Sequence, residues 1–107
     1  MTKTATPALD QVSIAHRYKF SPVTITVPAS ARRRQYDLTI TDATITVGHP
    51  HLGPDHVAID VAGAPAGTKP SLRHQRLIRF STAGGNPILL GDDLPLDTAP
   101  DFLLAAL

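Results

Sequence analysis

Three histidines lie within eight residues of one another in the stretch VGHPHLGPDH, residues 47–56. His49 and His51 flank a single proline, which favours an extended backbone at His49. Because side chains two residues apart in an extended chain point to the same side, both imidazoles are placed to bind one ion. His56 follows a Gly-Pro-Asp turn and would supply a third nitrogen. The spacing therefore predicts a site for zinc, nickel or copper, the ions that imidazole suits.

The same stretch is also typical of a solvated, proline-rich surface loop. We favour this alternative, because a histidine count alone is weak evidence for a metal site. No cofactor is expected, apart from a divalent transition metal if His49, His51 and His56 hold one. Three such ligands with one open position would activate a bound water, so metal-dependent hydrolysis is the corresponding enzymatic hypothesis.

The sequence contains no other pattern that is typical of an active site. The chain has no cysteine, and it has no Gly-x-Ser-x-Gly, Walker A or Rossmann glycine motif. No catalytic residue is therefore assigned, and a non-enzymatic protein is favoured.

Two groups of arginines form the second candidate site. They are Arg32, Arg33 and Arg34 in one polar segment, and Arg73, Arg76 and Arg79 further along the chain. If the fold brings them together, their guanidinium groups would bind phosphate or another anion, including nucleic acid. The scarcity of aromatic residues argues against a platform for single-stranded nucleic acid. The alternatives are a basic face that meets an acidic protein and a face neutralised by neighbouring aspartates.

The C-terminal stretch TAPDFLLAAL predicts a short helix over about residues 98–107. Thr98 is expected to cap it, with Asp101 three residues later as in a capping box. Four apolar residues of this segment are the candidate protein interface: Phe102, Leu103, Leu104 and Leu107. A helix this short is not stable alone, so these side chains must dock on a surface.

Polar and apolar residues alternate near the N-terminus. One face of residues 11–20 carries Val12, Ile14, His16, Tyr18 and Phe20. This alternation predicts a half-buried strand, with His16 as a hydrogen-bonded core histidine. The Ser21-Pro22 pair ends the pattern, and a second strand is expected over 23–27.

The stretch YDLTITDATITV, residues 36–47, predicts a hairpin folded about Asp42-Ala43 with a four-residue loop over 41–44. A further strand is expected at 57–61. Segment 71–82 is ambiguous, because its arginine spacing fits a helix while its apolar residues favour a strand through 77–82.

The composition favours strands and turns over helices. All acidic residues are aspartate, and threonine and proline are abundant. The predicted organisation is a flexible N-terminal arm over 1–10 and one β domain over 11–107. The predicted fold is all-β, an antiparallel β-sandwich or small barrel of about six to eight short strands with a short C-terminal helix.

The net charge is only +1, but basic blocks (1–36 and 63–80) alternate with acidic blocks (37–62 and 81–107). Such alternation suits docking to another molecule. No apolar run approaches the roughly 20 residues that span a bilayer, so no membrane partner is expected, and the location is predicted as cytoplasmic or within a macromolecular assembly. These features predict a non-enzymatic module that binds a protein or its own copies. The alternatives are a nucleic-acid-binding accessory protein and a histidine-ligated metal protein.

Overall fold

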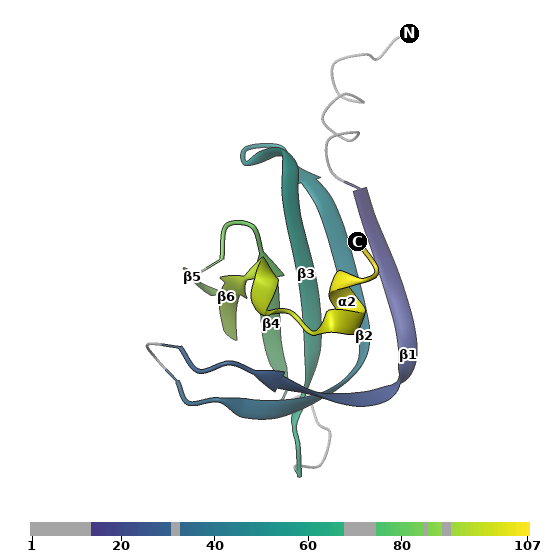
Figure 1. Cartoon of the computed structure of the whole chain (residues 1–107), viewed down its shortest axis with the longest axis vertical. Coiled ribbons are helices and arrows are strands. Elements are labelled where there is room, and N and C mark those ends of the chain that lie inside the picture. Colours follow the sequence, from purple (N-terminus) through teal and green to yellow (C-terminus); the bar gives the residue numbers. More distant parts are fainter. Residues whose placement is uncertain (1–13, 31–32, 68–74, 85, 89–90) are drawn as a thin grey trace, which may run out of the picture.

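The computed structural model describes residues 14–30, 33–67, 75–84, 86–88 and 91–107. Within these ranges the strands form one six-stranded sheet in the order β1-β2-β3-β4-β6-β5 (Figure 1). The strands are β1 (Ile14–Val27), β2 (Tyr36–His49), β3 (Gly53–Pro65), β4 (Arg76–Ser81), β5 (Asn86–Ile88) and β6 (Gly91–Pro95). A 3-10 helix, η2 (Leu96–Thr98), and a short α-helix, α2 (Asp101–Leu104), follow. The predicted N-terminal arm lies outside the described residues.

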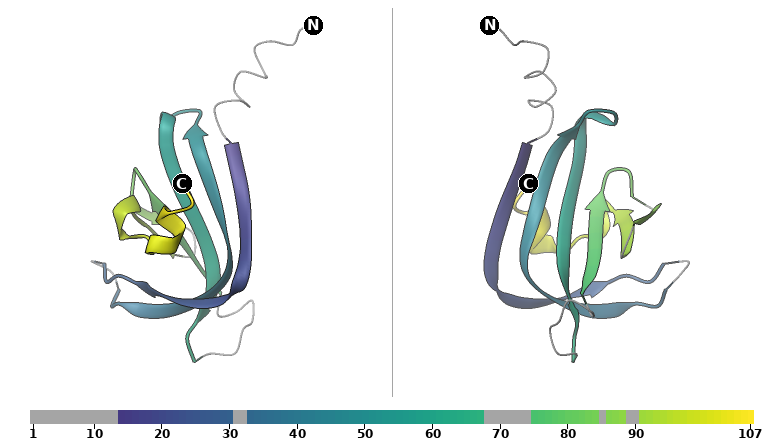
Figure 2. Two further views of the ribbon diagram at one scale, coloured as in Figure 1. Left: turned by 45° about the vertical axis from the view of Figure 1, so that its right-hand side comes forward. Right: turned by 180° about the vertical axis from the view of Figure 1, so that it is seen from behind.

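The fold is mostly β, as predicted, but the predicted sandwich or barrel is not confirmed. The strands form a single open sheet, and β4 pairs with β6 in parallel whereas the other neighbouring pairs are antiparallel. The sheet is strongly curved, and η2 and α2 lie against its concave face (Figure 2). The C-terminal segment therefore covers the apolar face that a second sheet would cover in a sandwich.

The first two predicted strands are one continuous strand, β1. Its pairing with β2 shifts register between Lys19 and Val23. Pro22 lies within this irregularity, on an edge strand, which is where a residue without a backbone N–H is tolerated. The proline therefore marks a bend within a strand and not its end.

The predicted hairpin over residues 36–47 is wrong, because β2 runs straight through it. Ile40 pairs with Val23 on one side and Gly63 on the other. The pairing of β2 with β3 shifts between Ile40 and Ala43, both of which are buried. One extra residue in β2 restores the inward direction of the apolar side chains. The change in the alternation therefore marks a β-bulge, which bends the strand without reversing it.

The irregularities in β1 and β2 lie side by side, since Lys19 pairs with Asp42 and Val23 with Ile40. Bulges increase the local bend and twist of a sheet. Beyond this point the two strands swing together across the end of the sheet (Figure 1). There Arg33 forms an ion pair with Asp92 of β6, so the tip of the first hairpin is tied to the far side of the sheet.

One apolar cluster fills the concave face. Its buried members are Ile25, Val27, Leu38, Ile40, Ala43, Ile45, Ile59, Val61, Ile78, Phe80, Leu94, Ala99 and Leu103. The predicted strands at 23–27 and 57–61 both supply side chains to it, as their alternation indicates. Segment 76–81 is strand β4, so the strand interpretation of that part is confirmed.

The first half of β1 differs from the prediction. Every residue from 14 to 19 is exposed, so this half is not half-buried and His16 is not a core histidine. No described element buries the concave side of this half, whereas Phe20 at its end is half-buried and its ring meets Phe102 of α2 edge-on at 5.5 Å.

The C-terminal helix is shorter than predicted. Thr98 does not cap it, because its hydroxyl donates to the carbonyl of Pro95, 2.6 Å away, and closes η2. The residue before α2 is Pro100, which has no side-chain capping bond. No helix in the described ranges is long and apolar enough to cross a membrane.

Candidate functional site

His49 has a structural role in the turn between β2 and β3. Its Nδ1 accepts hydrogen bonds from the backbone N–H groups of His51 (3.0 Å) and Leu52 (3.1 Å). A neutral imidazole that accepts at Nδ1 carries its proton on Nε2. While these bonds persist, His49 has no free lone pair to offer a metal ion.

His56 lies at the start of β3, and it is the one buried histidine in the described part of the chain. Its Nδ1 lies 2.8 Å from the hydroxyl of Thr82, which also accepts the N–H of Val57 at 3.2 Å. The ring centroid of His49 is 5.5 Å from that of His56 and 5.8 Å from that of His51.

The three predicted metal ligands therefore do lie close together. Even so, no group of three or more metal-ligating side chains among the described residues is arranged to hold an ion. Binding through His49 would require it to release the two amides of the turn. The metal site stays a prediction, tested by metal analysis of the purified, untagged protein.

The predicted arginine patch is divided between the two faces of the sheet. Arg79 lies on the outer face, where its Nε donates to Asp60 at 2.7 Å. The hydrogen bond to Asp60 raises the pKa of Arg79 above its ordinary range, against the opposing effect of burial. Arg32 and Arg73 lie outside the described residues.

The other three arginines of the patch come together on the concave side. Arg33, Arg34 and Arg76 line one pocket with Gln35, Tyr36 and Pro65. The sequence grouped these three arginines with three others, but it gave no sign of Tyr36. Its role depends on the burial of its hydroxyl, which only the tertiary structure shows.

The predicted C-terminal interface docks largely on the chain's own sheet. Leu103 is buried in the core, and Leu104 packs against it. Phe102 contacts Phe20 but remains partly exposed, and Leu107 is 55% exposed. Phe102 and Leu107 are therefore the most exposed of the four, while Leu104 is partly buried and Leu103 is buried.

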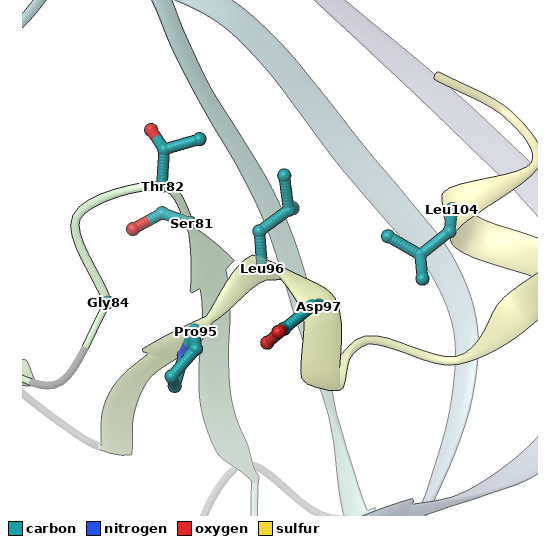
Figure 3. Close-up of a pocket in the computed structure, with 7 residues that line it drawn as sticks. All are labelled: Ser81, Thr82, Gly84, Pro95, Leu96, Asp97 and Leu104. Atoms are coloured by element: carbon teal, nitrogen blue, oxygen red, sulfur yellow. The ribbon is translucent and has the colours of Figure 1, made fainter.

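A second pocket, of about 460 Å³, lies between the end of β4, η2 and α2 (Figure 3). It is lined by Ser81, Thr82, Gly84, Pro95, Leu96, Asp97 and Leu104. Its two hydroxyls are already engaged, because Ser81 donates to Asp93 at 2.7 Å and Thr82 bonds His56. The pocket therefore offers a ligand mostly apolar contacts and few free polar groups.

The first half of β1 is a third candidate surface, because every residue from 14 to 19 is exposed. As the outermost strand, β1 leaves the backbone N–H and C=O groups of its outer edge unpaired within the described sheet. Ile14 is 54% exposed, Tyr18 is 40% exposed, and Val47, opposite Ile14 on β2, is also exposed. This surface was not predicted from the sequence, because the alternation of polar and apolar residues in the first half of β1 is the same as in a half-buried strand.

No family model matches the chain, and no curated protein or solved structure is significantly similar to it. Its candidate functional surfaces are therefore the edge of β1, the arginine pocket and the histidine turn.

Proposed function

We propose that the protein is a non-enzymatic assembly module that associates with a second copy of itself through the edge strand β1. The observation that carries this proposal is the exposure of both faces of residues 14–19 beside a strand edge that no described strand pairs with. Strand edges of this kind bind by adding a strand, so that backbone hydrogen bonds supply affinity and side chains supply selectivity.

The side chains of this segment suit antiparallel pairing with an identical strand. If a two-fold axis passes at His16, Ile14 of each copy lies opposite Tyr18 of the other, on the same face. Arg17 then lies opposite Ala15 and not opposite another arginine. Aromatic and β-branched residues paired across strands stabilise a sheet by about 0.2–1 kcal/mol per pair.

The size of this contact sets the expected affinity. Residues 14–18, which pair with one another in this register, span about 17 Å. A contact of this length lies at the low end of protein interfaces, below about 1,200 Å² in total. The dimer is therefore weak and forms as the concentration rises, and it offers a building block for a larger assembly.

A double substitution tests the proposal. Ile14→Lys with Tyr18→Lys places positive charges opposite each other in the paired strands, while the fold is retained because both side chains are exposed. Sedimentation analysis is expected to show a concentration-dependent dimer for the native protein and a monomer for the variant. Unchanged association in the variant would exclude the β1 edge as the interface.

Two control variants are needed. One tests whether added charge alone prevents association, and the other tests whether the C-terminal segment is the interface. Leu52→Lys with Gln75→Lys adds the same charge at exposed residues outside β1, and is expected to dimerise normally. Leu107→Lys tests the interface that the sequence predicted at the C-terminus. If this change abolishes association while the β1 variant does not, the C-terminal segment is the interface.

A general nucleic-acid-binding role is less favoured than self-association. The outer face of the sheet, which carries Arg17, Lys19 and Arg79, also carries four aspartates: Asp37, Asp42, Asp60 and Asp93. Two of these carboxylates already pair with the two arginines. This face therefore lacks the excess positive charge that a protein surface needs to bind the phosphate backbone of a nucleic acid.

A further inference from the structure

The pocket that contains three arginines is independent of the β1 edge. It has a volume of about 310 Å³ and lies where β2 begins, β3 ends and β4 begins. Tyr36 pairs with Val27 and Pro65 with Leu38, and both of these partners are buried, so the pocket opens on the concave face. Volumes near 300 Å³ are at the small end of ligand pockets.

Arg33 lines this pocket, and its side chain is held in place by several contacts. It forms an ion pair with Asp92 on β6, and both side chains are largely buried. Its Nη1 also donates to the carbonyl of Pro28 at 3.3 Å and to that of Arg34 at 3.4 Å. Its guanidinium carbon stands 4.8 Å from the centre of the Tyr36 ring. Because Asp92 neutralises Arg33, Arg33 adds little net charge to the pocket.

Arg34 and Arg76 are different from Arg33. Neither forms an ion pair with any described residue, and both are exposed. Each presents a planar group of N–H donors that matches the oxygens of a phosphate or carboxylate. The pocket thus holds two positive charges that its described surroundings leave uncompensated.

The hydroxyl of Tyr36 is the third unusual feature. It is buried and has no hydrogen-bond partner among the residues that the structure describes. A buried polar group without a partner is costly, so such an atom points to a missing partner. Burial raises the pKa of Tyr36, although the charges of Arg33 and Arg76 oppose this rise. The hydroxyl therefore keeps its proton at neutral pH and is a hydrogen-bond donor.

We infer that this pocket binds a phosphate monoester, with Arg34 and Arg76 pairing with its oxygens and the Tyr36 hydroxyl donating to it. A phosphate monoester carries close to two negative charges at neutral pH, which matches the two unpaired guanidinium groups. Tyr36 lines the pocket and its hydroxyl is buried, so binding requires a side-chain movement that lets a phosphate oxygen reach this hydroxyl. The pocket admits a compact anion and not the length of a nucleic-acid strand.

Inorganic phosphate and phenyl phosphate are the probes, each compared with chloride at equal ionic strength. Thermal unfolding is expected at a higher temperature with either phosphate, because a ligand that binds only the folded state stabilises it. Arg34→Met and Arg76→Met are each expected to weaken binding at least tenfold, which matches the loss of one charge-assisted hydrogen bond. Arg17→Met removes an exposed arginine on the outer face and is expected to bind as the native protein does.

The Tyr36→Phe variant is expected to change stability and phosphate binding in opposite directions. Removing the unpaired hydroxyl is expected to raise the unfolding temperature without phosphate and to weaken phosphate binding by about tenfold. A variant with unchanged phosphate affinity would overturn the role of the hydroxyl. An equal effect of chloride and phosphate, or binding that survives both arginine substitutions, would overturn the site itself. If duplex DNA binds instead of phosphate and is lost with the same variants, the pocket is part of a nucleic-acid surface.

Discussion

The two halves of β1 carry similar alternating residues and yet have opposite environments. In the second half, Ile25 is 4% exposed and Val27 is fully buried. In the first half, Ile14 and Tyr18 lie on the same concave side of the sheet and are exposed. The difference arises because the bend between the halves carries the second half under the core, while nothing described covers the first.

This contrast separates two properties that alternation alone does not distinguish. Alternation reports that a segment can form a strand with one apolar face. Whether the chain itself covers that face depends on elements far away in the sequence, here the C-terminal segment. An apolar strand face that is left uncovered at a sheet edge is available to a partner, and this is the basis of the proposed self-association.

The largest effect is expected from truncating the buried half. Ile25→Ala should lower the free energy of unfolding by about 2–5 kcal/mol, because it removes packed methyl groups and leaves a cavity. Ile14→Ala makes the same chemical change in the exposed half, and should alter stability by no more than about 0.5 kcal/mol at monomeric concentrations. Denaturant unfolding of both variants measures the difference.

Equal losses in these two variants would contradict the contrast between the halves. They would show that the first half of β1 is covered in solution even at concentrations where the protein is a monomer.

The next effect concerns the bend between the two halves. Gly63 pairs with Ile40 at the β2 bulge, and an added Cβ would lie 2.0 Å from the carbonyl oxygen of Thr39. Because backbone cannot yield as a flexible side chain does, Gly63→Ala should destabilise the protein by about 1–3 kcal/mol. A stability like that of the native protein would mean that β2 and β3 approach less closely than described.

The strands were more predictable than their connections. The burial of Ile25 and Val27 and of Ile59 and Val61 follows directly from alternation. The false hairpin in β2 has a clear cause. A change in the alternation occurs both at a bulge and at a hairpin turn, and Asp42-Ala43 lacks the glycine that would have identified a two-residue turn.

The smallest effect is a pH dependence located at Tyr36, which lies opposite Val27 at the end of the buried half. Burial raises its pKa, so the unfolded chain releases the hydroxyl proton first, near pH 10. The free energy of unfolding should therefore fall as the pH rises through about 10 and towards the folded pKa. Tyr36→Phe should lack this part of the decline and be about 1 kcal/mol more stable at neutral pH.

Tyr18→Phe is the matched control, since it removes a hydroxyl from the exposed half and should leave stability at neutral pH unchanged. Unfolding curves at several pH values compare the three proteins. The account of Tyr36 fails if its variant and the native protein lose stability in parallel above pH 10.

The candidate sites were predictable in part. The sequence showed that Arg33, Arg34 and Arg76 belong to basic segments, but it could not show that Arg79 faces the opposite side of the sheet with Asp60. That separation depends on strand register, since one residue of shift reverses the face of a side chain. The close approach of the histidine rings could also be predicted from their spacing. The hydrogen bonds from the backbone N–H groups of the turn to Nδ1 of His49 could not.

The central claim is that the exposed half of β1 is a self-association edge, and sedimentation of the untagged protein over a wide concentration range tests it most directly. The account predicts that the mass rises with concentration from that of an 11.4 kDa chain towards twice that value. It also predicts that Ile14→Lys with Tyr18→Lys remains a monomer throughout. A native protein that is monomeric at every concentration would contradict the claim.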